Sequence, residues 1–224
     1  MSGYPRVPVP AAEDVPLDAL EYVVVDVETT GGSPDRGHRV TEVGALRVDR
    51  KGAVLDELST LVNPDRPIPR AVSRLTHITQ DMVAAAPRFE EIAPDFQRVT
   101  AGAVFVAHNA PFDRRFLKAE LVRANYTGLR GRQLCTVRLA RKTVPEIRRR
   151  SLDALLYFFA IPCEPRHRAF SDARATADLL LRLLDRAQDQ GVSTWNGLQE
   201  LLNRKAPRRK RSALPRSMDW PEWA

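Results

Sequence analysis

Two carboxylates stand where the sequence predicts the interior of a protein. Asp26 and Glu28 end the run Glu21-Tyr-Val-Val-Val-Asp-Val-Glu28, which is rich in β-branched residues and apolar enough for a central strand. Residues two apart on a strand share a face, so the two carboxylates would lie side by side and raise each other's pKa. Either the strand has ended by Asp26 and both acids are solvated, or a divalent cation compensates them.

Three further groups that could do chemistry lie near expected helix starts. Asp113 falls early in a helix expected over 110–124, and Asp172 falls in the first turn of a helix for which Ser171 is the expected N-cap. Each acid alone has a structural explanation, because acids near a helix N-terminus stabilise the helix dipole. His167 lies on the loop before Asp172. A lone loop histidine is usually a surface residue, but beside carboxylates an imidazole can take a proton from water near neutral pH.

The elements that must position these residues follow an α/β pattern. The first strand is followed by strand candidates at 38–48 and 53–62, which begin an antiparallel meander, and strands then alternate with helices. This pattern matches a ribonuclease-H-like architecture, although it also fits other α/β folds. The later expected elements are helical pieces up to residue 80, a helix at 89–100, a strand at 103–107, a short helix within 130–150, and helices from 151, over 171–188 and over 193–202.

The composition indicates a globular protein with one core domain: 224 residues, 43% hydrophobic and 28% charged. No stretch approaches the roughly 18 apolar residues of a membrane span, and the polar, proline-rich start lacks the core of a signal peptide. Cys135 and Cys163 have no zinc-ligand spacing, so we expect reduced thiols in a cytoplasmic protein without a membrane partner.

The net charge of +7 and the pI near 9.9 favour a polyanionic partner, but most of the surplus is local. Residues 204–224 carry seven Lys or Arg and two acids. We expect a flexible proline-rich leader at 1–18, the core domain at 19–190, a terminal helix at 191–203 and a basic flexible tail at 204–224. This tail contains Trp220 and Trp223 and serves either solubility, phosphate binding or protein docking.

Three segments taken together resemble the motifs of the DEDD exonuclease superfamily. They are Asp26-Val-Glu28-Thr-Thr-Gly31, His108-Asn-Ala-Pro-Phe-Asp113, and His167 followed by Asp172-Ala-Arg-Ala-Thr176, in that order. The histidine is typical of the DEDDh, or DnaQ-like, branch, which includes the proofreading (epsilon) subunit of bacterial DNA polymerase III and its stand-alone relatives. The resemblance covers about residues 22–184. It implies a ribonuclease-H-like fold whose mixed central sheet has three antiparallel strands first, then parallel strands, flanked by helices.

The resemblance implies a 3′→5′ exonuclease that depends on two divalent cations, Mg²⁺ or Mn²⁺. These hard cations prefer oxygen ligands, and a pair of them can stabilise both the attacking and the leaving oxygen at phosphorus. His167 would be the general base, and the product would be a nucleoside 5′-monophosphate. The implied metal ligands, which are also catalytic, are Asp26, Glu28, Asp113 and Asp172.

The resemblance also implies substrate contacts. In the family the segment after the first-motif glutamate lies against the terminal nucleotide, which makes Thr29, Thr30 and Gly31 candidates. His108 and Asn109 are further candidates, although we expect them chiefly to fix the loop that carries the second-motif aspartate.

The substrate class stays open. A single-stranded or frayed 3′ end of DNA, in proofreading, repair or end trimming during DNA replication, is the first candidate, and RNA 3′ ends are the alternative. The two differ only in how the site meets the 2′-hydroxyl. A non-catalytic nucleic-acid-binding or polymerase-accessory module is a third candidate, and the tail is a candidate contact for a DNA polymerase or repair partner.

Overall fold

Strand β1 (Tyr22–Thr29) supplies side chains to two separate cores. Tyr22 and Val24 pack into one core, whereas Val23 and Val25 pack into the other. Burial on both faces explains why the sequence of β1 reads as a continuous apolar run rather than an alternating one. The structure is a computed structural model, and it describes residues 14–163 and 166–204.

The sheet has five strands in the order β3-β2-β1-β4-β5. Strands β2 (Val40–Val48) and β3 (Val54–Leu61) continue from β1 as an antiparallel meander. Strands β4 (Val104–Ala107) and β5 (Gln133–Cys135) join the other side of β1 in parallel. This mixed sheet confirms the predicted fold class, and the expected strands differ from the observed ones by one or two residues at their ends.

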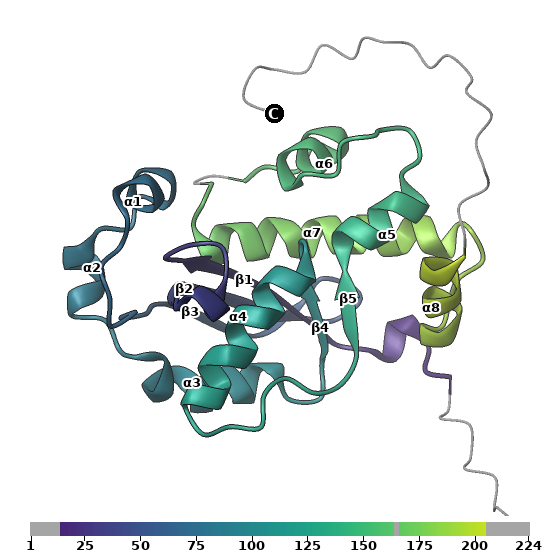
Figure 1. The fold of residues 1–224 in the computed structure, drawn as a ribbon. Coiled ribbons are helices and arrows are strands. Elements are labelled where there is room, and N and C mark those ends of the chain that lie inside the picture. Colours follow the sequence, from purple (N-terminus) through teal and green to yellow (C-terminus); the bar gives the residue numbers. More distant parts are fainter. Residues whose placement is uncertain (1–13, 164–165, 205–224) are drawn as a thin grey trace, which may run out of the picture.

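Helices cover both faces of the sheet (Figure 1). The helices α3 and α4 lie over one face, and α5, α6 and α7 lie over the other, with α8 beside α5. The long helix α7 packs directly on β1 and β2, the strands at the centre of the sheet. The helices are α1 (Arg70–Thr76), α2 (Gln80–Ala84), α3 (Phe89–Thr100), α4 (Ala110–Arg123), α5 (Thr136–Thr143), α6 (Leu152–Phe159), α7 (Ala169–Gln188) and α8 (Trp195–Asn203), with short 3-10 turns at Leu17–Ala19 and Pro34–Arg36.

The prediction that Ser171 caps α7 is wrong, because the helix begins two residues earlier, at Ala169. The carboxylate of Glu42 on β2 accepts a hydrogen bond from the Ala169 backbone N–H at 2.9 Å, so the cap comes from a distant strand. The first turn of α7 also touches β2 at Gly44. A Cβ atom there would lie 2.3 Å from the Ala169 backbone.

The expectation of a loose leader through residue 18 is wrong for its described part. Leu17 is buried, and its N–H donates to the Ser193 carbonyl at 2.9 Å. The Trp195 N–H donates to the Val15 carbonyl, also at 2.9 Å. Residues 14–19 are therefore attached to the connection between α7 and α8. The first thirteen residues, and the tail from 205 onward with both of its tryptophans, lie outside the described residues.

Within residues 14–163 and 166–204, no helix combines the length and the apolar composition that are needed to cross a lipid bilayer.

Candidate active site

Four carboxylates from three elements meet near the carboxyl end of β1. Asp26 and Glu28 project from one face of β1, as the spacing predicted, and both are partly buried. Asp113 comes from the first turn of α4 and Asp172 from the first turn of α7, and these two are only 3% and 5% exposed. The structure thus brings together the four acids that the sequence singled out.

Burial and repulsion between like charges raise the pKa values of three of these acids, Asp26, Glu28 and Asp113. The pKa of Asp26 lies well above its usual value because of burial, and the Asp113, Asp172 and Glu28 charges raise it further. Burial is also the main cause for Glu28, whose pKa rises to about 7. For Asp113 burial raises the pKa to about 8, against the lowering effect of backbone hydrogen bonds. The cluster therefore cannot be fully ionised near neutral pH without additional positive charge.

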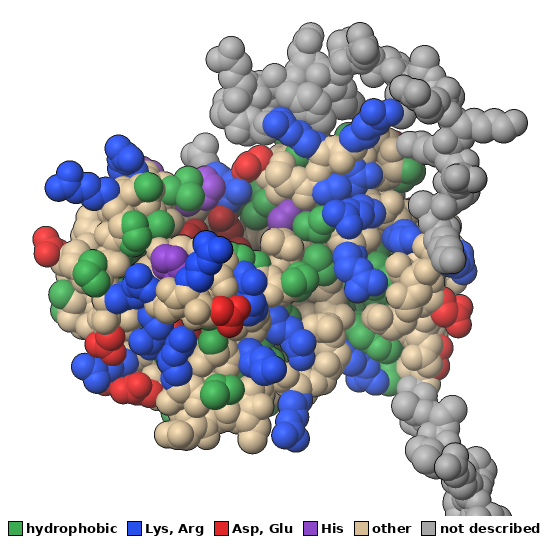
Figure 2. Space-filling model, viewed as in Figure 1, with side chains coloured by type: hydrophobic (Ala, Val, Ile, Leu, Met, Phe, Trp, Pro, Cys, Tyr) green, Lys and Arg blue, Asp and Glu red, His purple; other side chains and the backbone are tan. Residues whose placement is uncertain are grey.

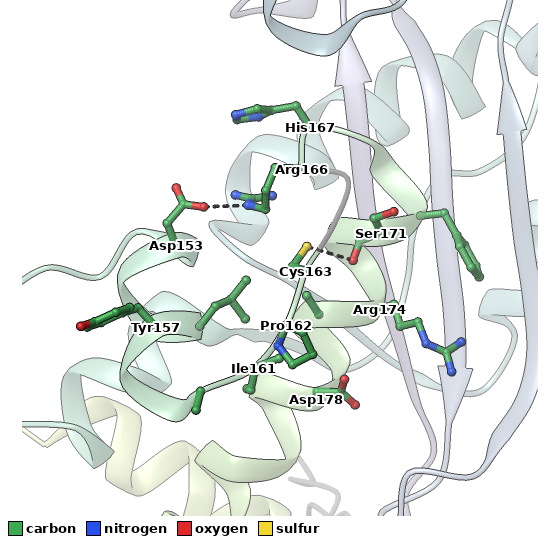
Figure 3. A pocket seen from close by; sticks show the side chains of 14 residues that line it. Asp153, Tyr157, Ile161, Pro162, Cys163, Arg166, His167, Ser171, Arg174 and Asp178 are labelled. Carbon is green, nitrogen blue, oxygen red and sulfur yellow. Dashed lines mark hydrogen bonds and ion pairs between the residues drawn. The ribbon is translucent and has the colours of Figure 1, made fainter. Parts of the chain in front are cut away.

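Part of that positive charge comes from Arg166, on the loop that leads into α7 (Figure 3). Its guanidinium forms an ion pair with Asp172 and donates through Nε to Asp153 at 2.7 Å. The Cys163 thiol donates to the same Asp172 carboxylate at 3.4 Å, and burial, followed by the Asp172 charge, raises the thiol pKa to about 11. These three residues were missed by the sequence reasoning. The only available signal was the position of Arg166 directly before His167.

His167 lies beside the acids. One ring nitrogen of His167 and carboxylate oxygens of Glu28 and Asp172 all lie within 4.8 Å of one another. The backbone of His167 has φ 58°, a left-handed conformation that is uncommon outside glycine. A pocket of about 1260 Å³ between α6 and α7 is lined in part by this histidine, which is therefore open to solvent (Figure 3).

The strained backbone of His167 is held by the ion pair that follows it. Arg168 donates through Nη2 to the Glu42 carboxylate at 2.7 Å, and Glu42 also caps Ala169. Glu42 is only 2% exposed. Sequence reasoning missed this residue, although an acid inside the apolar run of β2 is the same kind of signal that identified Asp26.

The residues after Glu28 form a closed turn. The hydroxyl of Thr29 donates to the Gly31 carbonyl at 2.9 Å. Thr30 is fully buried, and its hydroxyl accepts from the Arg39 N–H at 3.0 Å, so its side chain supports the turn. A Cβ atom at Gly31 would lie 2.4 Å from the ring of His38. The substrate contacts of Thr29, Thr30 and Gly31 stay a prediction.

His108 ties the end of β4 to two other segments. Its Nδ1 lies 2.9 Å from the Thr136 hydroxyl, and its Nε2 lies 2.9 Å from the Arg150 carbonyl. Burial lowers its pKa to about 4, so the ring is neutral, and the carbonyl partner assigns its proton to Nε2. His108 therefore fixes the loop before α4. Asn109 begins that helix with a left-handed backbone, φ 71°.

The family follows from a comparison with known proteins. The family model described as Exonuclease matches residues 23–180, a segment that contains all four acids and the histidine. The chain belongs to the DEDDh exonuclease family. This agrees with the resemblance that its three motifs indicated.

Several curated relatives share this domain. A Mycobacterium tuberculosis protein, named as an inferred bifunctional exonuclease/endonuclease, is 43% identical over 85% of this chain and 30% of its own length. A DNA polymerase III subunit epsilon-like protein of Rhodobacter capsulatus is 40% identical over 84% of this chain and 27% of its own. The chain thus spans less than a third of these two relatives. It matches 77% of the Treponema pallidum DNA polymerase III subunit epsilon, at 39% identity over 74% of this chain.

Solved structures agree on the fold. Exonuclease X in complex with 5′ overhanging duplex DNA has a TM-score of 0.63 and 28% identity, and the match covers 81% of this chain and 99% of that one. Escherichia coli exonuclease I in complex with a dT13 oligonucleotide has a TM-score of 0.67 at 18% identity, covering 77% of this chain and 42% of that one.

Proposed function

We propose that this chain hydrolyses phosphodiester bonds from the 3′ end of DNA and releases nucleoside 5′-monophosphates. The observation that carries the proposal is the cluster of four acids at the end of β1, beside His167, which itself lines a pocket. A stable structural site would not gather like charges whose pKa values rise to about 7 and 8. A site that binds cations during a reaction would gather such acids, because the bound cations compensate their charges.

The donor set fits two divalent cations, Mg²⁺ or Mn²⁺. Asp26, Glu28, Asp113 and Asp172 would hold them, because carboxylate oxygens are the ligands these hard cations prefer. When bound, the cations would supply electrostatic stabilisation of the charge that develops on the oxygens at phosphorus.

The chain's own residues supply the proton transfer and the positioning. His167 takes the proton of the attacking water at a ring nitrogen, within reach of Glu28 and Asp172. The ion pair between Glu42 and Arg168 fixes the residue that follows His167, and it thereby holds the imidazole beside the acids. The turn of Thr29 and Gly31 borders the terminal nucleotide, and neutral His108 holds the loop that presents Asp113.

DNA is the proposed substrate because the relatives are named for DNA polymerase III, and because exonuclease X, 28% identical, was solved with DNA. RNA is the competing substrate, since the acids and the phosphate contacts would serve both. The same names support a DNA polymerase as partner. The tail that the sequence suggested for docking lies outside the described residues.

The test is digestion of a 5′-labelled single-stranded DNA and the matching RNA with Mg²⁺ or Mn²⁺, beside an EDTA control. Asp26→Asn removes one charge from the cluster without changing its volume. The matched control is Asp95→Asn, an exposed aspartate on α3, on the other face of the sheet. We expect a ladder that shortens from the 3′ end of DNA, unchanged in Asp95→Asn and absent in Asp26→Asn and in EDTA. A ladder on RNA alone would reverse the substrate assignment, and no ladder on either would favour a binding module.

A further inference from the structure

Four cationic side chains line one pocket on the side of α4 that is turned away from Asp113. The pocket has a volume of about 410 Å³ and lies between α4, β5, α5 and α8. No acidic residue lines it, and among the described residues none of its four cations forms an ion pair with an acid. The four cations are Arg114, Arg115, Lys118 and Arg138.

The pocket gathers this unpaired charge in one place. Some arginines of the molecule are neutralised by a nearby acid, as in the pairs of Arg39 with Glu120 and Arg168 with Glu42, whereas these four cations face one another across one cavity. In the pocket, Arg114 and Lys118 are four residues apart on one helix, a spacing at which like charges repel. Such a concentration of cations attracts an anion from solution.

The pocket also offers directed hydrogen-bond donors. Arg115 donates one bond to the Gly32 carbonyl at 2.8 Å, and Arg114 donates one to the Leu129 carbonyl at 3.2 Å. Carbonyl partners orient a guanidinium without neutralising it, and each guanidinium has five N–H groups. The side-chain nitrogen of Gln199, which lines the same pocket, is buried and has no hydrogen-bond partner among the described residues.

The position of the pocket identifies the anion. Helix α4 carries Asp113 on one side and the pocket cations Arg114 and Lys118 on another. An α-helix with its side chains is about 10 Å in diameter, so the acid cluster and the pocket are separated by about the width of this helix. Arg115 contacts Gly32, which directly follows the turn proposed to border the terminal nucleotide. Figure 2 shows Lys and Arg side chains over this face, around a hollow in which acidic side chains are visible. A strand whose 3′ end enters the acid cluster would reach the pocket within a few nucleotides, at about 3.4 Å per nucleotide.

We propose that this pocket binds backbone phosphates of the nucleic-acid strand, a few nucleotides upstream of the 3′ end that is cut. The proposal rests on the proposed function and adds the route of the strand across the protein. Its ligand chemistry is the phosphodiester group, which arginine and lysine bind through charge and hydrogen bonds without reading the base.

The test compares a substrate that reaches the pocket with one that does not. Lys118→Ala combined with Arg138→Ala removes two exposed cations. The control, Lys51→Ala combined with Arg182→Ala, removes two exposed cations near the turn between β2 and β3, at the other end of β1. The substrates are a 20-nucleotide single-stranded DNA and the p-nitrophenyl ester of thymidine 5′-monophosphate.

We expect the pocket variant to lose about tenfold in kcat/KM on the oligonucleotide and less than twofold on the mononucleotide ester. The slope of log affinity against log salt, from fluorescence anisotropy of a labelled oligonucleotide in EDTA, should become shallower by about 1.4, since each phosphate contact on a single strand contributes about 0.7. The control variant should match the wild type in all three measurements.

Three outcomes separate this proposal from the proposed function. Equal losses in the pocket variant and the control would overturn the pocket assignment, and so would equal losses on the two substrates. A wild type that cleaves neither substrate would sink the proposed function. In that case the anisotropy slopes would still confirm or refute the pocket, because they need no hydrolysis.

Discussion

Glu42 holds the start of α7 from a neighbouring strand. Its buried carboxylate contacts both Arg168 and the Ala169 N–H, and these are the two residues that follow the strained His167. The Arg168 guanidinium is 38% exposed, so water can solvate it when the Glu42 charge is lost, and the main effect is the loss of the anchor at the start of α7. Glu42 therefore acts on the proposed reaction as a positioning residue, through the orientation of the imidazole.

Glu42→Gln tests this role. The amide keeps the volume and one acceptor but leaves the Arg168 guanidinium without its counter-charge. We expect kcat to fall about tenfold with little change in KM, because substrate binding is preserved while the base is misplaced. The measurement is steady-state kinetics with a urea unfolding curve. Glu57→Gln, an exposed glutamate on β3, should change neither parameter. An unchanged kcat in Glu42→Gln would contradict the positioning role.

The pKa of Asp113 makes stability depend on pH. Its folded-state pKa of about 8 lies above the ordinary value, so between about pH 4 and pH 8 the folded protein holds a proton that the unfolded chain releases. Stability in EDTA should therefore fall as the pH rises through this window. Asp113→Asn removes the carboxyl group whose raised pKa causes this loss of stability. We expect this variant to unfold a few °C above the wild type at pH 8, corresponding to about 1–3 kcal/mol, with a smaller gap at pH 5.

Differential scanning calorimetry at the two pH values checks this expectation. Mn²⁺ should raise the unfolding temperature of the wild type more than that of Asp113→Asn, because the variant has lost a proposed ligand. A gap between the two proteins that is the same at pH 5 and pH 8 would contradict the titration of Asp113.

At the scale of elements, the contact between β2 and α7 sets the distance between two halves of the acid cluster. Asp26 and Glu28 belong to β1, which pairs with β2, whereas Asp172 belongs to α7. Gly44 lets the α7 backbone approach β2 to a separation that no side chain at that position would permit. The helix therefore rests on the sheet through its backbone.

Gly44→Ala should separate these elements. Because the new methyl group would meet the backbone of Ala169 and not a mobile side chain, we expect a loss of about 1–3 kcal/mol in the free energy of unfolding. We also expect kcat to fall about a hundredfold, since a shift near 1 Å misplaces Asp172 and His167. Urea unfolding and kinetics measure the two effects. Gly32→Ala, whose methyl group meets nothing within 4 Å, is the stability control. Full activity in Gly44→Ala would show that α7 tolerates the displacement.

The elements also show what the sequence could predict. The apolar run of β1 and the spacing of Asp26 and Glu28 are local signals, and they located the first strand and its acids. The cap of α7 could not be found in this way, because Glu42 lies 127 residues away from Ala169. The three-residue strand β5 was missed within an arginine-rich region, since so short a strand leaves no periodic pattern.

At the scale of the whole molecule, the described residues, 14–163 and 166–204, contain every group of the proposed site, and they begin with a segment attached to the start of α8. Leu17 is buried, and Val15 is bonded to Trp195. The sequence predicted a loose segment here because four prolines precede Leu17, and prolines disfavour regular helices and strands. Its attachment depends on a partner near residue 195, which no local pattern reveals.

A pair of truncated chains tests this boundary. A chain of residues 14–204 should keep the kcat/KM of the full chain on the mononucleotide ester within twofold. A chain of residues 19–204 loses the burial of Leu17 and the two backbone hydrogen bonds that join this segment to Ser193 and Trp195, and it should be less stable by about 2–4 kcal/mol. Chemical denaturation of both chains measures the difference. Equal stability would restore the interpretation of residues 14–18 as a loose leader.

The order of the motifs along the chain has a consequence for synthesis on the ribosome. The first pair of acids lies at the beginning of the domain, and Asp172 lies on α7, the last helix to pack on β1 and β2. A nascent chain can form the antiparallel strands early, but it holds only part of the acid cluster until α7 has emerged. A truncated translation product that ends before residue 167 would therefore lack both His167 and Asp172. The nuclease activity proposed here would appear only when nearly the whole domain has been made, so an incomplete chain would not cut the surrounding nucleic acid.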